Sequence, residues 1–107
     1  MISLQKKPTG DGRLTRGVTV TDEVFEALVS GRRTFVLKGY DEWNEEKFLK
    51  SPVTHLFVSR HTDRRGASLL FTVSAVCRFA MQVRSEWREY IRIDLVSGYE
   101  FVPARRK

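Results

Sequence analysis

The most constraining feature of the chain is a long apolar stretch, Ala67 to Val83, in which side chains alternate in character. A period of two is typical of a β-strand, because its successive side chains point to opposite faces of the sheet. One face is entirely apolar and consists of Leu69, Phe71, Val73, Ala75, Cys77 and Phe79. The other face is mixed and consists of Leu70, Thr72, Ser74, Val76 and Arg78. The pattern predicts a central strand of a curved sheet or barrel, with Cys77 and Phe79 buried.

A helix between two short strands is predicted before this stretch. Asp22 can serve as its N-cap, and Gly31 suits the left-handed residue that ends a helix. The spacing between them is that of one buried stripe, formed by Val24, Phe25, Leu28 and Val29. The flanking strands are the short stretch at Val18 and Val20 and the segment Arg33–Lys38.

The remaining segments complete a small mixed fold. Asp41–Ser51 is acidic at its front and basic at its back, which favours a helix. The other predicted elements are a strand at Val53–Arg60, a hairpin turn at Thr62–Gly66, a strand at Glu89–Val96 with Ile91, Ile93 and Leu95 inward, and a brief pairing at Tyr99–Val102. The chain is therefore expected to be an α+β protein. Its sheet would be a small, strongly bent or closed β-barrel of five or six strands with two short helices.

The length of 107 residues allows one compact domain. We expect residues 1–17 to form a flexible basic arm, residues 18–103 the domain, and residues 104–107 a basic tail. No apolar run is long enough to cross a membrane, and the first residues lack the apolar stretch of a signal peptide. A cytoplasmic protein that does not bind membranes is expected.

Composition narrows the possible activities. A net charge of +6 favours polyanionic partners: nucleic acid, an anionic membrane surface or an acidic protein face. A single cysteine excludes an intramolecular disulfide framework and a cysteine-based zinc site within one chain. His55 and His61 would lie about 20 Å apart along an extended strand at ~3.3 Å per residue, too far to share a metal. No nucleophile, phosphate-loop or metalloprotease motif is present, so we expect neither catalysis nor a metal or cofactor.

Basic residues gather at predicted turns and termini, while acidic residues concentrate in the two helices. Each group alone is typical of a solvated loop, but a shared positive face would follow a phosphate backbone. The candidate nucleic-acid-binding residues of the turns are Arg32, Arg33, Thr34, Lys38, Arg60, His61, Arg64 and Arg65. The aromatic residues expected near turns or at outward positions, and so able to stack on bases, are Tyr40, Trp43, Trp87, Tyr90 and Tyr99. Tyr40 and Trp43 are the candidates for stacking at the groove, whereas Phe25, Phe35, Phe57, Phe71 and Phe79 are expected in the core.

The segment Val20–Lys38 resembles the opening motif of ASCH domains, which belong to the PUA-like superfamily. That family has a short helix ending in small-Gly-(Arg/Lys)-Lys-Thr, followed by a strand that commonly ends in a basic residue. Ser30-Gly31-Arg32-Arg33-Thr34 and Lys38 occupy these positions. The resemblance implies a small closed barrel with a cleft beside the Gly-Arg-Arg-Thr turn, where the family is thought to meet RNA or a modified nucleoside.

The resemblance also implies what is missing. Family members that hydrolyse acylated cytidine use the motif lysine and a polar residue three positions later, and these positions hold Arg33 and Val36. Arginine cannot act as a base and valine offers no polar group. The Gly-Asp that usually opens the following strand is replaced by the acidic segment Asp41–Ser51. The chain therefore resembles a diverged binding module.

Three functions remain open from the sequence. The first is a non-catalytic domain that binds RNA or single-stranded nucleic acid in a basic groove beside the Gly-Arg-Arg-Thr turn. The second is a protein-interaction module, such as a phage or mobile-element inhibitor of a host nucleic-acid-handling complex, whose acidic segment imitates a row of phosphates. The third is a diverged nucleoside amidohydrolase. The sequence leaves the oligomeric state open.

Overall fold

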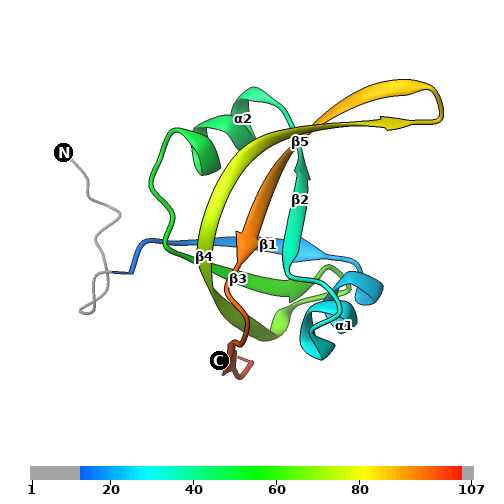
Figure 1. Ribbon diagram of the computed structural model, residues 1–107. Coiled ribbons are helices and arrows are strands. Elements are labelled where there is room, and N and C mark those ends of the chain that lie inside the picture. Colours follow the sequence, from blue (N-terminus) through cyan, green and yellow to red (C-terminus); the bar gives the residue numbers. More distant parts are fainter. Residues whose placement is uncertain (1–12, 105–107) are drawn as a thin grey trace.

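The computed structural model describes residues 13–104, apart from the side chains of Arg64 and Arg65, and this part is a sheet-rich α+β domain (Figure 1). Its elements follow in the order β1 (Thr15–Val20), α1 (Asp22–Ser30), β2 (Phe35–Gly39), α2 (Glu42–Asn44), η2 (Glu45–Leu49), β3 (His55–Arg60), β4 (Asp63–Val83), β5 (Glu86–Leu95) and β6 (Glu100–Val102). The predicted class, with six strands and two short helical regions, is confirmed for the described residues.

The six strands form one bent sheet in the order β1-β3-β4-β5-β2, with β6 paired to β4. β1 runs parallel to β3, and every other pairing is antiparallel. β1 and β2 are the two ends of this order, so the sheet is not closed, and the closed-barrel alternative is wrong. The chain passes from β1 through α1 into β2, and α1 lies where β1 ends and β2 begins (Figure 1).

β4 is long enough to belong to both halves of the sheet. Its first half pairs with β3 up to Thr72, and its second half pairs with β5 from Val73 onward. Between Val73 and Ala75 the register shifts by one residue, so Ser74 forms a β-bulge. A one-residue shift exchanges the faces of all later side chains, which is why Cys77 is exposed and Phe79 only half-buried. The prediction that both are buried is wrong.

The core lies inside the bend of the sheet and is covered by α1 and η2. Ile91 and Ile93 of β5 are fully buried against Leu56 and Val58 of β3, and Leu95 is also buried, so the predicted inward face of this strand is confirmed. The helical segments add Phe25, Leu28 and Phe48. Burial of these apolar side chains is the main stabilisation available to a domain of this size.

The helices begin and end at recognisable residues. The N-cap of α1 is Thr21 rather than Asp22, because Thr21 Oγ1 accepts a hydrogen bond from Val24 N at 3.3 Å. Gly31 ends α1 at a φ of 80° and donates its N–H to Leu28 O, as predicted. The predicted helix at Asp41–Ser51 is present but divided, since α2 continues as the π-helical turn η2.

The ends of the domain differ slightly from the predicted boundaries. β1 begins at Thr15, so the last three residues of the predicted arm belong to the sheet. Residues 1–12 of the arm and residues 105–107 of the tail lie outside the described residues. The predicted turn at Thr62–Gly66 is shorter, because β4 begins at Asp63. No helix within residues 13–104 is long and apolar enough to span a membrane.

The far half of β4 and the start of β5 extend beyond the rest of the sheet as a two-stranded ribbon (Figure 1). The tip is formed by Arg84 and Ser85, whose φ angles are 52° and 68°. Two consecutive positive φ angles are typical of a type I′ turn, which normally uses Asn and Gly. Arg84 and Ser85 are not residues that this turn type favours, so the sequence does not predict a type I′ turn here.

We expect Gly31→Ala to lower the free energy of unfolding by about 1–2 kcal/mol, because an L-residue is strained at this φ. Chemical denaturation monitored by circular dichroism measures the loss. Gly17→Ala is the matched control, since Gly17 lies in β1 and a Cβ there meets nothing within 4 Å. Equal stability losses in the two variants would contradict the assignment of Gly31 as the left-handed cap.

Candidate nucleic-acid interface

A cavity of about 420 Å³ lies between the two end strands of the sheet. β1 and the start of α1 form one wall, and β2 forms the other. The lining residues are Thr19, Val20, Thr21, Val24, Arg33, Val36, Leu37, Lys38, Gly39 and His61. The cavity therefore lies beside the Gly-Arg-Arg-Thr turn, where the resemblance placed a cleft.

The turn after α1 positions the first cation of the cavity. Gly31 reverses the chain, and Arg33 N then donates a hydrogen bond to Ala27 O at 3.2 Å. Thr34 O accepts from Leu95 N at 2.9 Å, which attaches the start of β2 to β5. Arg33 is thus fixed at the entrance of β2 by backbone hydrogen bonds on both sides.

The cavity combines apolar walls with positive charge. The apolar lining residues are valines and a leucine, and the polar ones include Arg33, Lys38, His61, Thr19 and Thr21. None of the lining residues that the structure describes is acidic. Asp22, the acid next to Thr21, accepts a hydrogen bond from Thr62 Oγ1 at 3.1 Å and pairs with Arg60 at 3.4 Å. The arrangement suits a ligand with a negative charge and a planar or apolar body.

Arg33 is a partly desolvated cation. Its Nε donates to Phe35 O at 2.9 Å, and its guanidinium carbon lies 4.4 Å from the centroid of the Phe35 ring. Burial, and then the charge of Arg92, lower the pKa of Arg33, which stays charged as arginines do. No described carboxylate lies within ion-pair distance of Arg33 or Lys38. A bound anion would supply the missing opposite charge.

The structure brings together three of the predicted site residues, Arg33, Lys38 and His61. Arg32 and Thr34 are exposed beside the cavity and do not line it. Arg32 turns back so that its Nε donates to Ser30 Oγ at 3.1 Å.

Arg60, predicted to hold phosphate, is paired with two carboxylates of α1. Its guanidinium pairs with Glu26 at 2.6 Å and with Asp22 at 3.4 Å, and it lies 4.3 Å from the Phe25 ring centroid. The hydrogen bond to Glu26 is the main reason that the pKa of Arg60 is raised. Arg60 therefore fastens α1 to β3. The side chains of Arg64 and Arg65 lie outside the described ones.

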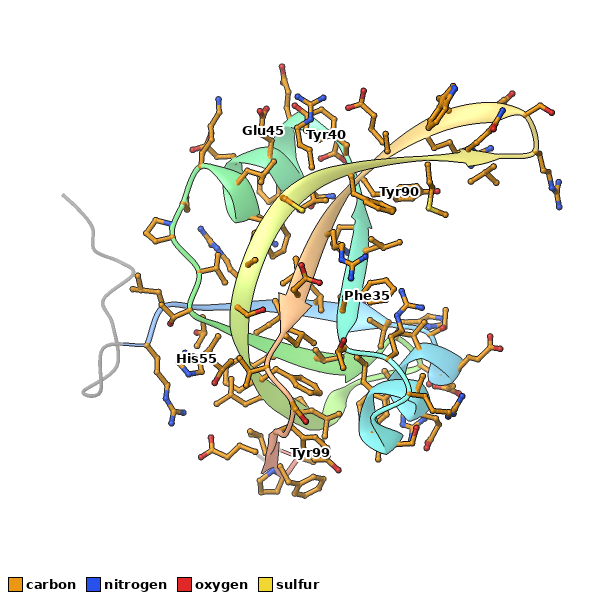
Figure 2. The ribbon with its side chains drawn as sticks, in the orientation of Figure 1. Phe35, Tyr40, Glu45, His55, Tyr90 and Tyr99 are labelled. Carbon is orange, nitrogen blue, oxygen red and sulfur yellow. The ribbon has the colours of Figure 1, made fainter. Side chains whose placement is uncertain are left out.

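The predicted stacking residues lie at the other end of β2. Burial and then a hydrogen bond with Glu45, which lies near Tyr40 (Figure 2), raise the pKa of Tyr40. The Tyr40 ring centroid is 4.2 Å from the guanidinium carbon of Arg78. Trp43 of α2 is 71% exposed, with Lys47 Nζ 5.8 Å from its ring centroid. Neither residue lines the cavity, so the structure does not bring them together with Arg33.

Sequence reasoning missed the wall formed by β1 and α1, which contributes Thr19, Thr21 and Val24. Thr21 is recognisable as a helix cap, but nothing in the sequence indicates that this segment faces β2 across a gap. Only the bend of the sheet brings the two segments together.

The described side chains offer binding groups rather than a metal site. No group of three or more His, Cys, Asp or Glu residues that could hold a metal ion occurs among them. His55 forms a 2.8 Å hydrogen bond with Thr54 Oγ1 and does not line the cavity, so the two histidines do not share a site.

Replacing Glu45 by Gln is expected to lower the pKa of Tyr40. Partial burial and then the Glu45 hydrogen bond raise that pKa, so the neutral phenol is favoured in the folded protein. The resulting stability is present below the ordinary tyrosine pKa and is lost as the pH rises through the raised value. An absorbance titration of ionised tyrosine measures the shift. Glu46→Gln is the control, and an unchanged titration in Glu45→Gln would contradict the hydrogen bond.

Comparisons with known proteins add no relative. No family model, no curated protein and no solved structure matches the chain. The functional argument therefore rests on the cavity and on the surfaces beside it.

Proposed function

We propose that this protein is a non-catalytic domain that binds single-stranded nucleic acid, with RNA favoured, in the cavity between β1 and β2. The proposal includes the PUA-like relationship, in which a bent sheet carries a cleft beside the Gly-Arg-Arg-Thr turn. The observation that supports it best is the pair of cations in the cavity, Arg33 and Lys38, with no acidic residue among the described lining.

Phosphate is the anion that fits these groups. An arginine guanidinium can donate two parallel hydrogen bonds to phosphate oxygens, and lysine adds a point charge. The volume of about 420 Å³ lies within the range of ligand cavities, roughly 300–1,000 Å³. The valine and leucine walls leave room for the apolar face of a base next to its phosphate.

We propose no catalysis because Arg33 and Val36 occupy the two positions at which hydrolytic ASCH proteins have a lysine and a polar residue. Arg33 stays protonated and cannot accept a proton from water. Val36 is 2% exposed and packs in the core, so no polar group occupies that position. The diverged nucleoside amidohydrolase has no support from these residues.

A protein-interaction module is the second candidate, and the surface of α2 favours it. Glu42 of α2, its N-cap Asp41 and Glu46 of η2 are exposed, and Trp43 of α2 is 71% exposed. Tryptophan is enriched among the residues that dominate protein interfaces. Such a module would bind a basic protein surface through α2 and leave the cavity unused.

We expect the double variant Arg33→Gln and Lys38→Gln to bind single-stranded RNA about tenfold or more weakly than the parent. Each lost phosphate contact should also reduce the slope of log affinity against log salt by ~0.7. Fluorescence anisotropy at ~50 and ~150 mM salt, with labelled single-stranded RNA, single-stranded DNA and duplex DNA, measures both quantities.

The control is the double variant Arg32→Gln and Lys50→Gln, which removes the same charge from exposed positions outside the cavity. It should keep most of the parent's affinity. Equal losses in the two double variants would mean that overall charge, rather than the cavity, causes binding. If the parent binds none of the three nucleic acids, the α2 surface becomes the candidate to test, with Trp43→Ala.

A further inference from the structure

We propose a second contact surface for the same ligand: the outer face of β2, β5 and β4 stacks unpaired bases on Phe79 and Tyr90. This inference rests on the proposed function and adds a site outside the cavity. In this proposal Phe79 and Tyr90 take the stacking role that the sequence suggested for Tyr40 and Trp43. Tyr40 is already covered by Arg78, and neither Tyr40 nor Trp43 lines the cavity. The surface is called the outer platform below and comprises Phe35, Phe79, Tyr90 and Arg92.

The platform exists because of the bulge at Ser74. After the bulge, Ala75, Cys77 and Phe79 of β4 point away from the core, whereas Val76 packs against it. Phe79 is the direct cross-strand partner of Tyr90, so the two rings lie on the same outer face. Both are half-buried, and the helices cover the opposite side of the sheet.

Tyr90 has open space on its other side. Its partner on β2 is Gly39, which has no side chain, and a Cβ built there meets nothing within 4 Å. Figure 2 shows Phe35 and Tyr90 along the same side of the molecule, away from Tyr99 at its other end. Neighbouring strands of a sheet lie ~4.8 Å apart. Aromatic rings on neighbouring strands of an open sheet face stack on bases in one common mode of single-stranded RNA recognition.

Arginine side chains accompany the rings. The guanidinium carbon of Arg92 lies 4.2 Å from the Phe35 ring centroid and 5.7 Å from that of Phe79. Arg92 is held in place by its Nε, which donates to Asp94 Oδ1 at 2.8 Å. A guanidinium plane fixed beside aromatic rings can itself stack on a base and attract the adjoining phosphate.

Arg33 makes the platform continuous with the cavity. Arg33 is one of the lining residues of the cavity, and its guanidinium lies over the Phe35 ring, as does that of Arg92. A strand whose phosphate binds Arg33 and Lys38 could therefore place its following bases over Arg92, Tyr90 and Phe79. Positive charge together with planar rings fits unpaired nucleotides better than an apolar protein segment, for which aliphatic side chains would serve equally well.

The test uses the full chain and a single-stranded RNA of about ten nucleotides that contains 2-aminopurine, whose fluorescence falls when it stacks on an aromatic ring. The parent should quench the probe. The double variant Phe79→Leu and Tyr90→Leu keeps apolar side chains but removes the rings. It should bind about tenfold more weakly and lose most of the quenching.

A matched control removes two exposed aromatic rings elsewhere, Trp43→Leu and Trp87→Leu, each 71% exposed in the parent. This control should bind and quench like the parent. Circular dichroism and thermal melting establish that all variants fold. The parent should quench the probe in single-stranded RNA and should not quench the same probe in duplex RNA. Because this comparison uses only the parent protein, a folding defect in a variant cannot affect it.

The possible results separate the two proposals. If the parent binds RNA through Arg33 and Lys38 but the leucine variant binds and quenches like the parent, the outer platform is wrong and the proposed function remains. If the tryptophan control loses the quenching instead, stacking occurs at α2 or the ribbon, and the platform is again wrong. If the parent binds no nucleic acid, both proposals fail, and a protein partner is indicated.

Discussion

The fold depends on the curvature of a single strand, β4. It pairs with β3 and β6 through its first half and with β5 through its second, so both parts of the sheet are joined through it. The bend places the two end strands, β1 and β2, on either side of one cavity. The bulge at Ser74 lets the strand turn and exchanges the face of its later side chains. Both proposed contact surfaces follow from this one strand.

The ion pairs that the structure describes do not involve the cations that line the cavity. Arg60 is paired with Asp22 and Glu26, and the other pairs that the structure describes also lie outside the cavity: Arg13–Glu100, Arg78–Glu89, Arg88–Glu86 and Arg92–Asp94. Exposed pairs of this kind add little stability. Their carboxylates already have partners, whereas Arg33 and Lys38 line the cavity without a described ion pair.

Local patterns predicted much of the fold and only part of the candidate site. The alternation of Ile91, Ile93 and Leu95 identified the inward face of β5, and Gly31 marked the end of α1, because both signals depend on near neighbours. The same reasoning failed at Cys77 and Phe79. A bulge is a single extra residue in a pairing with another strand, and the β4 sequence alone carries no sign of it. The wall that β1 contributes to the cavity is likewise a product of tertiary structure.

Arg33 couples charge and stacking so closely that its own replacement cannot separate them. Arg33 is one of the residues that line the cavity, its guanidinium lies over Phe35, and burial and then its neighbour Arg92 lower its pKa. Replacing Arg33 would remove a cation of the proposed phosphate site and also the guanidinium that lies over the Phe35 ring. Lys38 reports on charge without contacting the platform, and Phe79 reports on stacking without lining the cavity. Variants of Lys38 and of Phe79 therefore measure the proposed charge and stacking contributions separately, whereas a variant of Arg33 would change both.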